Sequence, residues 1–207
     1  MSYQKTKKIW TNWWGEHASY GKATSSIEHI DKTRNMIKLH SELLGKCSSM
    51  CELGIGNGRS LYYFHEAYPD WDFRGNDIFP KIKEVISVCY PKVLDFADIA
   101  VQDTLAFLKE CPEADLFLTF GHLMHIPNDV IGEVCDLIIQ KAQKYILVYE
   151  AFPHNPRFEL PDRYNGYRFE RDYRGMFKGS RHMDIKIDDN DEKGTRQALY
   201  MFEGRDG

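Results

Sequence analysis

The sequence lacks any apolar run that approaches 18 residues, so we expect no segment that crosses a membrane. No apolar stretch follows the basic start of the chain, and a secretory signal peptide is therefore not expected. It also lacks a surplus of positive charge, because 27 basic residues face 31 acidic ones. A protein whose main task is to bind nucleic-acid backbones is therefore not expected.

Cysteine is scarce and shows no functional spacing. The five cysteines form neither a C-x-x-C pair nor the pattern of a zinc site, which favours reduced thiols in a cytoplasmic protein. The acidic run at 188–191 does not have the spacing of a calcium-binding loop, so no metal is predicted. The hydrophobic fraction of 43% excludes disordered and fibrous classes.

From residue 48 onward, strand patterns alternate with helix patterns. We expect strands at 50–54, 71–78, 97–102, 115–120 and 145–150, and helices at 59–68, 80–89, 104–109 and 128–142. A long loop at 153–167 and a short helix at 169–177 precede two alternating segments, 182–188 and 197–202, which predict a β-hairpin. The order indicates an α/β, Rossmann-like fold: a mostly parallel sheet of seven strands, with helices on both faces and an antiparallel C-terminal hairpin.

The segment 1–46 precedes this alternation. It is aromatic at its start and then shows helical spacing, with Gly45 as a plausible stop. We therefore expect a core domain at 47–207 and a separate aromatic and helical segment at 1–46.

A glycine-rich turn lies between the first predicted strand and the first predicted helix of the core domain. Glycines at 54, 56 and 58 would let the backbone approach a ligand closely, although they could form only a tight turn. The dinucleotide pattern would need glycine at 59, where the chain has Arg59. No Lys-Ser or Lys-Thr pair follows, so the turn is not a P-loop.

Carboxylates follow the next two predicted strands. Asp77 ends the second strand, where a carboxylate can accept both hydroxyls of a ribose or can simply be solvated. Asp103 follows the third strand and could bind a ligand, cap the next helix, or do both. Asp98 competes with Asp103 if the third strand lies in an earlier register.

The glycine turn, with an acidic residue two positions before its first glycine, resembles motif one of the class I S-adenosylmethionine-dependent methyltransferases. Asp77, the Asp103-Thr104 pair and the 120–126 segment match later elements of that family in order over residues 48–150. The resemblance implies S-adenosylmethionine as cofactor, with Asp103 at the position that binds adenine. It implies these cofactor-binding residues: Glu52, Gly54, Gly56, Asn57, Gly58, Asp77, Ile78, Asp103, Thr104, Phe120 and Gly121. Trp14 and Tyr20 are expected at the cofactor as part of an aromatic lid.

A narrower resemblance is to small methylases associated with the biosynthesis of pseudaminic acid and other surface sugars. It rests on Trp-Trp-Gly-Glu at 13–16, on Tyr20, and on the segments 120–126, 164–167 and 171–175. That subfamily has Phe-Gly where this chain has His17-Ala18, so the N-terminal match is partial.

Methyl transfer from a sulfonium mainly requires a positioned acceptor and exclusion of water. A hydroxyl acceptor also benefits from a base, worth about 10²–10⁴-fold. Candidate bases or acceptor ligands are His125, His122 and Glu150, although the histidines could only pack. Acceptor binding is expected from the post-strand residues Tyr149, Tyr164, Tyr167 and Arg171, although the arginine could only be solvated.

Aromatic residues at 10, 13, 14 and 20 could pack as a flap or close as a lid over the donor. We predict a methyltransferase that acts on a small polar acceptor, with O-methylation of a sugar, nucleotide-sugar or other sugar-linked metabolite favoured. The alternatives are N-methylation of an amine or amino sugar, and a protein that binds S-adenosylmethionine without catalysis. Protein or RNA methylation is disfavoured without a basic face.

Overall fold

The computed structural model describes residues 3–16, 27–152, 169, 171–177, 182–188 and 196–206. The chain divides into two compact units. We call residues 8–110 the glycine-loop unit, and residues 1–7 with 111–207 the Glu150 unit. Helix α1 (Tyr3–Glu16) contributes residues to both.

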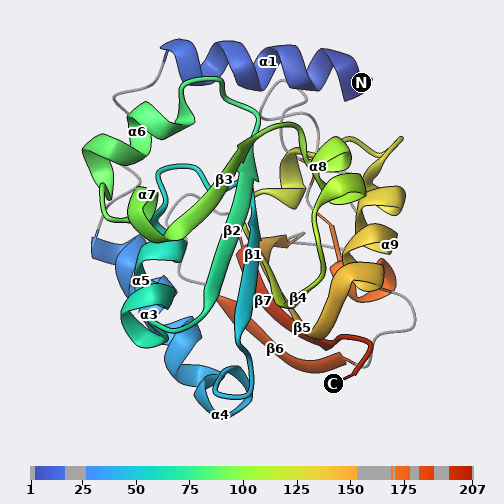
Figure 1. Cartoon of the computed structure of the whole chain (residues 1–207). Coiled ribbons are helices and arrows are strands. Elements are labelled where there is room, and N and C mark those ends of the chain that lie inside the picture. The colour runs from blue at the N-terminus through green and yellow to red at the C-terminus, as the bar shows by residue number, and fades with distance from the viewer. Residues whose placement is uncertain are drawn as a thin grey trace. The chain divides into compact units, whose positions relative to one another are not determined.

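Parallel strands and their connecting helices make up the glycine-loop unit (Figure 1). Its strands are β1 (Ser49–Leu53), β2 (Asp72–Asp77) and β3 (Ala97–Val101), paired in the order β3-β2-β1. Helices α3 (Ile27–Leu39) and α4 (Ser41–Leu44) precede β1. The connections are α5 (Arg59–Ala67), α6 (Ile82–Cys89) and α7 (Val93–Phe96), and α8 (Thr104–Glu110) follows β3.

The Glu150 unit has mixed strand pairing. Strand β4 (Ala114–Phe120) is parallel to β5 (Ala142–Phe152), and between them lie the 3-10 turn η1 (Leu123–His125) and helix α9 (Ile131–Lys141). After the 3-10 turn η2 (Tyr173–Gly175) come β6 (His182–Asp188) and β7 (Arg196–Glu203). Strand β7 is antiparallel to both β5 and β6, which confirms the predicted C-terminal hairpin.

Each unit has an apolar core formed by its strands. Leu116, Phe117 and Leu118 of β4 are fully buried, as are Ile146 and Leu147 of β5, because both faces of these strands are covered. In the glycine-loop unit, residues 50, 51 and 53 of β1 are also fully buried. These buried apolar strands fix the positions of the strand ends, and most candidate site residues lie at or just after those ends.

A single glycine permits a close backbone contact beside β1. A Cβ on Gly75 would lie 2.4 Å from the Ile55 side chain and 2.6 Å from the Glu52 carbonyl oxygen. The Ile55 amide also donates to the Asn76 carbonyl at 3.0 Å. Together these contacts hold the start of the glycine turn against β2.

Seven strands were expected and seven are described, three in one unit and four in the other. Several boundaries differ from the prediction. Helix α9 begins at Ile131 rather than 128, because residues after Pro127 form a turn in which the Val130 amide donates to the Pro127 carbonyl. Strand β5 begins at Ala142, which pairs with Ala114. The expected helix at 169–177 is only the turn η2, and α1, α7 and η1 were not predicted.

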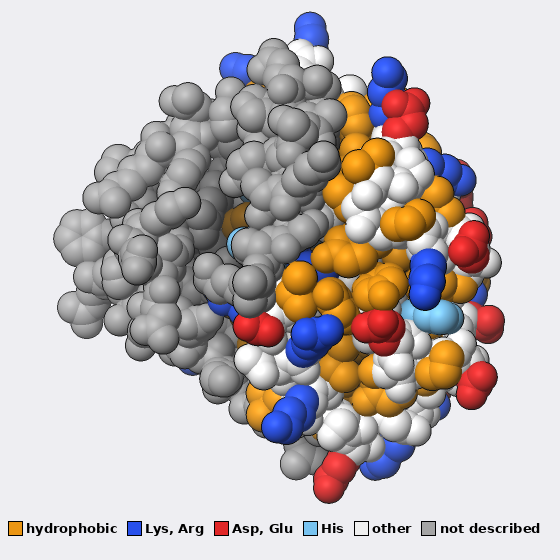
Figure 2. Space-filling view, turned by 90° about the vertical axis from the view of Figure 1, so that its left-hand side faces the viewer, with side chains coloured by type: hydrophobic (Ala, Val, Ile, Leu, Met, Phe, Trp, Pro, Cys, Tyr) orange, Lys and Arg blue, Asp and Glu red, His pale blue; other side chains and the backbone are white. Residues whose placement is uncertain are grey.

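Charges of both signs are mixed with apolar side chains on the described part of the face in Figure 2, as the near balance of basic and acidic residues predicts. No helix among the described residues is both long enough and apolar enough to cross a membrane. The division into segments 1–46 and 47–207 stays a prediction.

Candidate functional site

The glycine turn follows β1 and leads into α5. Gly54, Gly56 and Gly58 have φ angles of 69°, 53° and 86°, a region that other residues adopt only at a cost. The Asn57 side chain accepts from the Arg59 amide at 3.2 Å and supports the entry to the helix. The backbone geometry therefore confirms the predicted strand, glycine turn and helix.

Asp77 is connected directly to this turn. One carboxylate oxygen accepts from the Gly56 amide at 3.0 Å, and the other accepts from the Phe79 amide at 3.0 Å. The side chain is 6% exposed. Burial raises the pKa of Asp77, while amide donors, including that of Ile78, act in the opposite direction. Two of the expected cofactor anchors are thus in contact.

Glu52 lies in β1 and is 2% exposed. Burial raises its pKa to about 8, and a hydrogen bond with Ser60 and the charge of Arg59 only partly offset this. The side chain is therefore protonated near neutral pH. Within the described part of the chain, its Oε2 atom has no hydrogen-bond partner. A buried polar atom without a partner is unusual, and it makes Glu52 a candidate for contact with a ligand.

Arg59 was not predicted to have a role at this turn. Its Nε donates to the Thr33 hydroxyl at 3.2 Å, and that hydroxyl donates to the His29 carbonyl at 3.0 Å. Arg59 therefore connects α5 with α3 while its charge acts on Glu52. The only sign of this role in the sequence was that Arg59 stands where the dinucleotide pattern has its third glycine.

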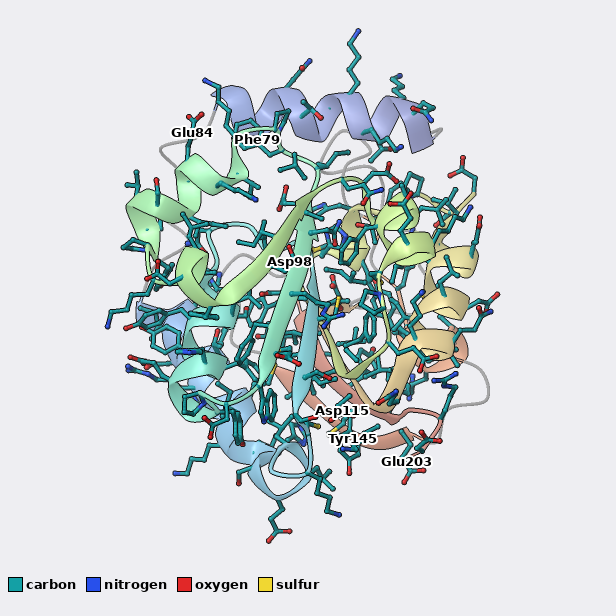
Figure 3. The ribbon with its side chains drawn as sticks, viewed as in Figure 1. Phe79, Glu84, Asp98, Asp115, Tyr145 and Glu203 are labelled. Atoms are coloured by element: carbon teal, nitrogen blue, oxygen red, sulfur yellow. The ribbon has the colours of Figure 1, made fainter. Side chains whose placement is uncertain are left out.

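Asp103 caps α8, because its side chain accepts from the Ala106 amide at 3.1 Å. The adjacent Thr104 is buried as the first residue of that helix. Asp98, labelled in Figure 3, instead lies within β3, where it is paired in register with Arg74 of β2. The predicted register of β3 is therefore confirmed, and Asp98 does not follow the strand. Binding of adenine by Asp103 stays a prediction.

In the Glu150 unit, Glu150 binds the backbone that follows β4. Its Oε1 accepts from the amides of His122 and Leu123, each at 2.8 Å, and its Oε2 accepts from Met124 at 3.1 Å. Glu150 is completely buried, and burial raises its pKa to about 7. The Glu150 carboxylate thus accepts from three backbone amides, and its role toward an acceptor stays a prediction.

Arg171, like Glu150, forms hydrogen bonds with the backbone that follows β4. Its guanidinium donates to the carbonyls of Leu123 at 3.0 Å and Ile126 at 2.6 Å, and to the Asn128 side chain at 2.6 and 3.2 Å. It also lies over the ring of Phe169, 4.6 Å from the centroid. Most N–H groups of this arginine, which was expected to bind the acceptor, therefore donate to backbone carbonyls and to the Asn128 side chain.

The remaining predicted residues of this unit lie where β4 and β5 end. Phe120 and Tyr149 are in ring contact at 4.5 Å, and the Gly121 amide donates to the Tyr149 carbonyl at 2.8 Å. Burial lowers the pKa of His122 to about 4, so its imidazole is neutral near pH 7. His125 is half-buried at the end of η1.

Some predictions fall on residues that the structure does not describe. Tyr20, Tyr164 and Tyr167 lie outside the described residues, and Trp14 lies in α1 with its side chain not described. Among the described residues, no group of His, Cys, Asp and Glu side chains has the arrangement of a metal site.

Comparison with known proteins gives structural likeness only. No protein-family model and no curated protein matches the sequence. Magnesium protoporphyrin IX methyltransferase from Synechocystis PCC 6803, with bound S-adenosylmethionine, is 13% identical, with a TM-score of 0.68 over 96% of this chain and 97% of that one. N-methyltransferase NodS from Bradyrhizobium japonicum WM9, with S-adenosylhomocysteine, is 12% identical, with a TM-score of 0.69 over 89% and 91%.

A third solved structure adds a bound acceptor. The 1,6-didemethyltoxoflavin-N1-methyltransferase from Burkholderia thailandensis, with its substrate and S-adenosylhomocysteine, is 13% identical, with a TM-score of 0.70 over 99% of this chain and 91% of that one. The chain thus has the α/β Rossmann-like fold of the class I S-adenosylmethionine-dependent methyltransferases.

Proposed function

We propose that the protein is a methyltransferase that uses S-adenosylmethionine as its methyl donor. The observation that carries the proposal is the glycine turn at positive φ, connected through the Gly56 amide to the buried carboxylate of Asp77. Solved structures of the same fold contain S-adenosylmethionine or S-adenosylhomocysteine, which supports this cofactor.

The residues present fit the cofactor. The Asp77 carboxylate accepts from the amides of Gly56, Phe79 and Ile78. Because a carboxylate has about four acceptor positions, it can still accept a ribose hydroxyl. The orphaned Oε2 of the protonated Glu52 offers a further polar contact. When bound, the cofactor supplies an activated methyl group. The chain's own residues bind the cofactor and acceptor, exclude water and place the acceptor atom for in-line attack.

We further propose that the acceptor is a small polar molecule. Our first candidate is the hydroxyl of a sugar or sugar-linked metabolite in the cytoplasm, as in the surface-sugar methylases that the sequence resembles. His125 is then the base, because Glu150 binds three amides and burial makes His122 a weak base. Tyr149, Tyr164 and Tyr167 complete the proposed acceptor site.

A nitrogen acceptor is the second candidate. The structural observation in its favour is that His122 is a weak base and that Glu150 is bonded to backbone amides. A neutral amine needs no base to attack a sulfonium. Amines and amino sugars therefore belong in the same acceptor panel.

The test is transfer of an isotopically labelled methyl group from S-adenosylmethionine to a panel of sugars, nucleotide-sugars, amino sugars and amines. Labelled product with at least one compound, located on oxygen or nitrogen by mass spectrometry, supports the proposal. Tight binding of the donor with no transfer to any member would favour a binding protein without catalysis.

A further inference from the structure

The segment from His122 to Asn128 has its backbone groups held from two opposite sides. On the amide side, the Glu150 carboxylate accepts three consecutive N–H groups, those of His122, Leu123 and Met124. A carboxylate that accepts several amides forms strong, charge-assisted hydrogen bonds. The first turn after β4 is thus fixed by one side chain from β5.

On the carbonyl side, the partners come from the segment after β5. Arg171 donates to the Leu123 and Ile126 carbonyls and to the Asn128 side chain. The Phe169 amide donates to the Met124 carbonyl at 2.7 Å. An anionic side chain therefore binds the amides and a cationic side chain binds the carbonyls of one short segment, which we call the clamped segment (122–128).

The surroundings of the clamp are buried. Glu150, Thr119 and Tyr173 have no exposed surface, and Cys135 of α9 is also buried nearby. Burial raises the pKa of Glu150, and the three amide donors partly offset this rise. The charge of Arg171 acts on Tyr173 and Cys135, and so does that of Glu150. Among the described residues, the Thr119 and Tyr173 hydroxyls have no hydrogen-bond partner, so the order of this region rests on the contacts of Glu150 and Arg171.

We propose that Glu150 and Arg171 are positioning residues that jointly fix the clamped segment, and with it the imidazoles of His122 and His125, for the acceptor. The inference rests on the proposed methyltransferase function. It replaces the direct roles in catalysis and acceptor binding that the sequence suggested for these two side chains. Arg171 also anchors the chain just after the 153–167 segment, in which acceptor-binding tyrosines are predicted.

The discriminating variant is Glu150→Gln. The glutamine amide keeps one oxygen for His122 and Leu123 but turns an NH₂ group toward the Met124 N–H, donor against donor. The matched control is Asp115→Asn, which also neutralises a buried carboxylate, one paired with Lys144 at 3.0 Å. Asp115 lies near Tyr145 and Glu203, at the opposite end of β4 from Phe120 (Figure 3).

Amide exchange and two-dimensional NMR follow the amides of 122–124 and the rings of the two histidines. Calorimetry measures S-adenosylmethionine binding separately. In Glu150→Gln we expect the Met124 amide to exchange at least about tenfold faster, and the ring resonances of both histidines to shift. In the original protein, the amides of 122–124 should titrate near pH 7 with Glu150, and this titration should vanish in the variant. Asp115→Asn should show none of these changes.

The readings keep the two proposals apart. If the original protein and its variants all fail to bind S-adenosylmethionine, the proposed function is wrong whatever the amides do. If donor binding persists while the Met124 exchange and histidine resonances of Glu150→Gln equal those of the control, the clamp is refuted. Should Glu150→Gln not fold, Arg171→Lys replaces it: shifted resonances across 122–128 would support the clamp, and unchanged ones would overturn it.

Discussion

At the residue scale, Asp77 accepts a hydrogen bond from the glycine turn, and we propose that it also binds the ribose of the donor. We expect Asp77→Ala to weaken S-adenosylmethionine binding by roughly 1.5–3 kcal/mol, about 10–150-fold, since hydrogen bonds to a charged group are lost. Calorimetric titration measures the change. Asp72→Ala, at the exposed start of the same strand, is the control and should bind normally. An unchanged dissociation constant in Asp77→Ala would remove Asp77 from the site.

Glu52 should make stability depend on pH. Its folded-state pKa of about 8 lies above the usual value of 4.5, so the folded protein binds more protons than the unfolded chain between these values. The stabilisation that the protonated Glu52 provides is therefore fully present below pH 4.5 and is lost as the pH rises toward 8. Between pH 5 and 8 we expect a loss of at least about 1 kcal/mol, since each pKa unit corresponds to about 1.4 kcal/mol.

The measurement is urea unfolding at several pH values, compared with Glu52→Gln, which imitates the protonated side chain. That variant should lack this part of the pH dependence. Parallel pH curves for the two proteins would show that Glu52 is ionised in the folded state.

The backbone of the glycine turn could be predicted from the sequence, whereas the partners of the candidate side chains could not. The positive φ angles of Gly54, Gly56 and Gly58 follow from the strand, turn and helix context, and residue order alone placed Asp77 beside them. The role of Glu150 could not be predicted, because its three partners are backbone amides 26 to 28 positions away. Main-chain donors carry no sequence signature.

At the scale of elements, Gly75 sets how closely β2 approaches the glycine turn. We expect Gly75→Ala to lower the free energy of unfolding by about 1–3 kcal/mol, because the new methyl overlaps the Glu52 carbonyl and the Ile55 side chain. Denaturant titration measures the loss. Gly132→Ala is the matched control: a Cβ there meets nothing within 4 Å in α9, so it should leave stability equal or raise it by up to about 1 kcal/mol. Equal stabilities would contradict the close contact.

The N-terminal segment provides a second prediction at this scale. We expect a chain without residues 1–25 to fold and to lose most methyl transfer, because the proposed lid excludes water and aligns the reactants. Circular dichroism and a transfer assay on the same sample are the measurements. Full activity in the folded truncation would refute the lid, and loss of folding would assign these aromatics to the core.

Elements with strong patterns could be predicted, and short ones could not. The apolar runs of β4 and β5 and the alternation of β6 and β7 gave their strands to within a few residues. The turns η1 and η2 are three residues each, too short for any periodicity to mark them. Glu150 of β5 binds the first, and the adjacent Asp172 caps the second. Helix α1 could not be predicted from end signals, because it has no acidic residue in its first turn and no basic residue in its last turn.

At the scale of the whole molecule, the boundary between compact units falls after Glu110, between α8 and β4. The sequence gives no sign of this division, since strand and helix patterns continue across it. The glycine turn and Asp77 belong to one unit, and the clamped segment belongs to the other. The residues proposed to bind the donor lie in the glycine-loop unit, and donor binding by the full chain is the central claim.

Calorimetric titration of the full chain with S-adenosylmethionine and with S-adenosylhomocysteine tests that claim most directly. We predict one site with a dissociation constant in the micromolar range, about 8 kcal/mol of binding free energy, for each ligand. Adenosine triphosphate, which lacks the amino-acid moiety, serves as the competitor control and should bind far more weakly. Folded protein that shows neither heat nor competition with either ligand would contradict the account.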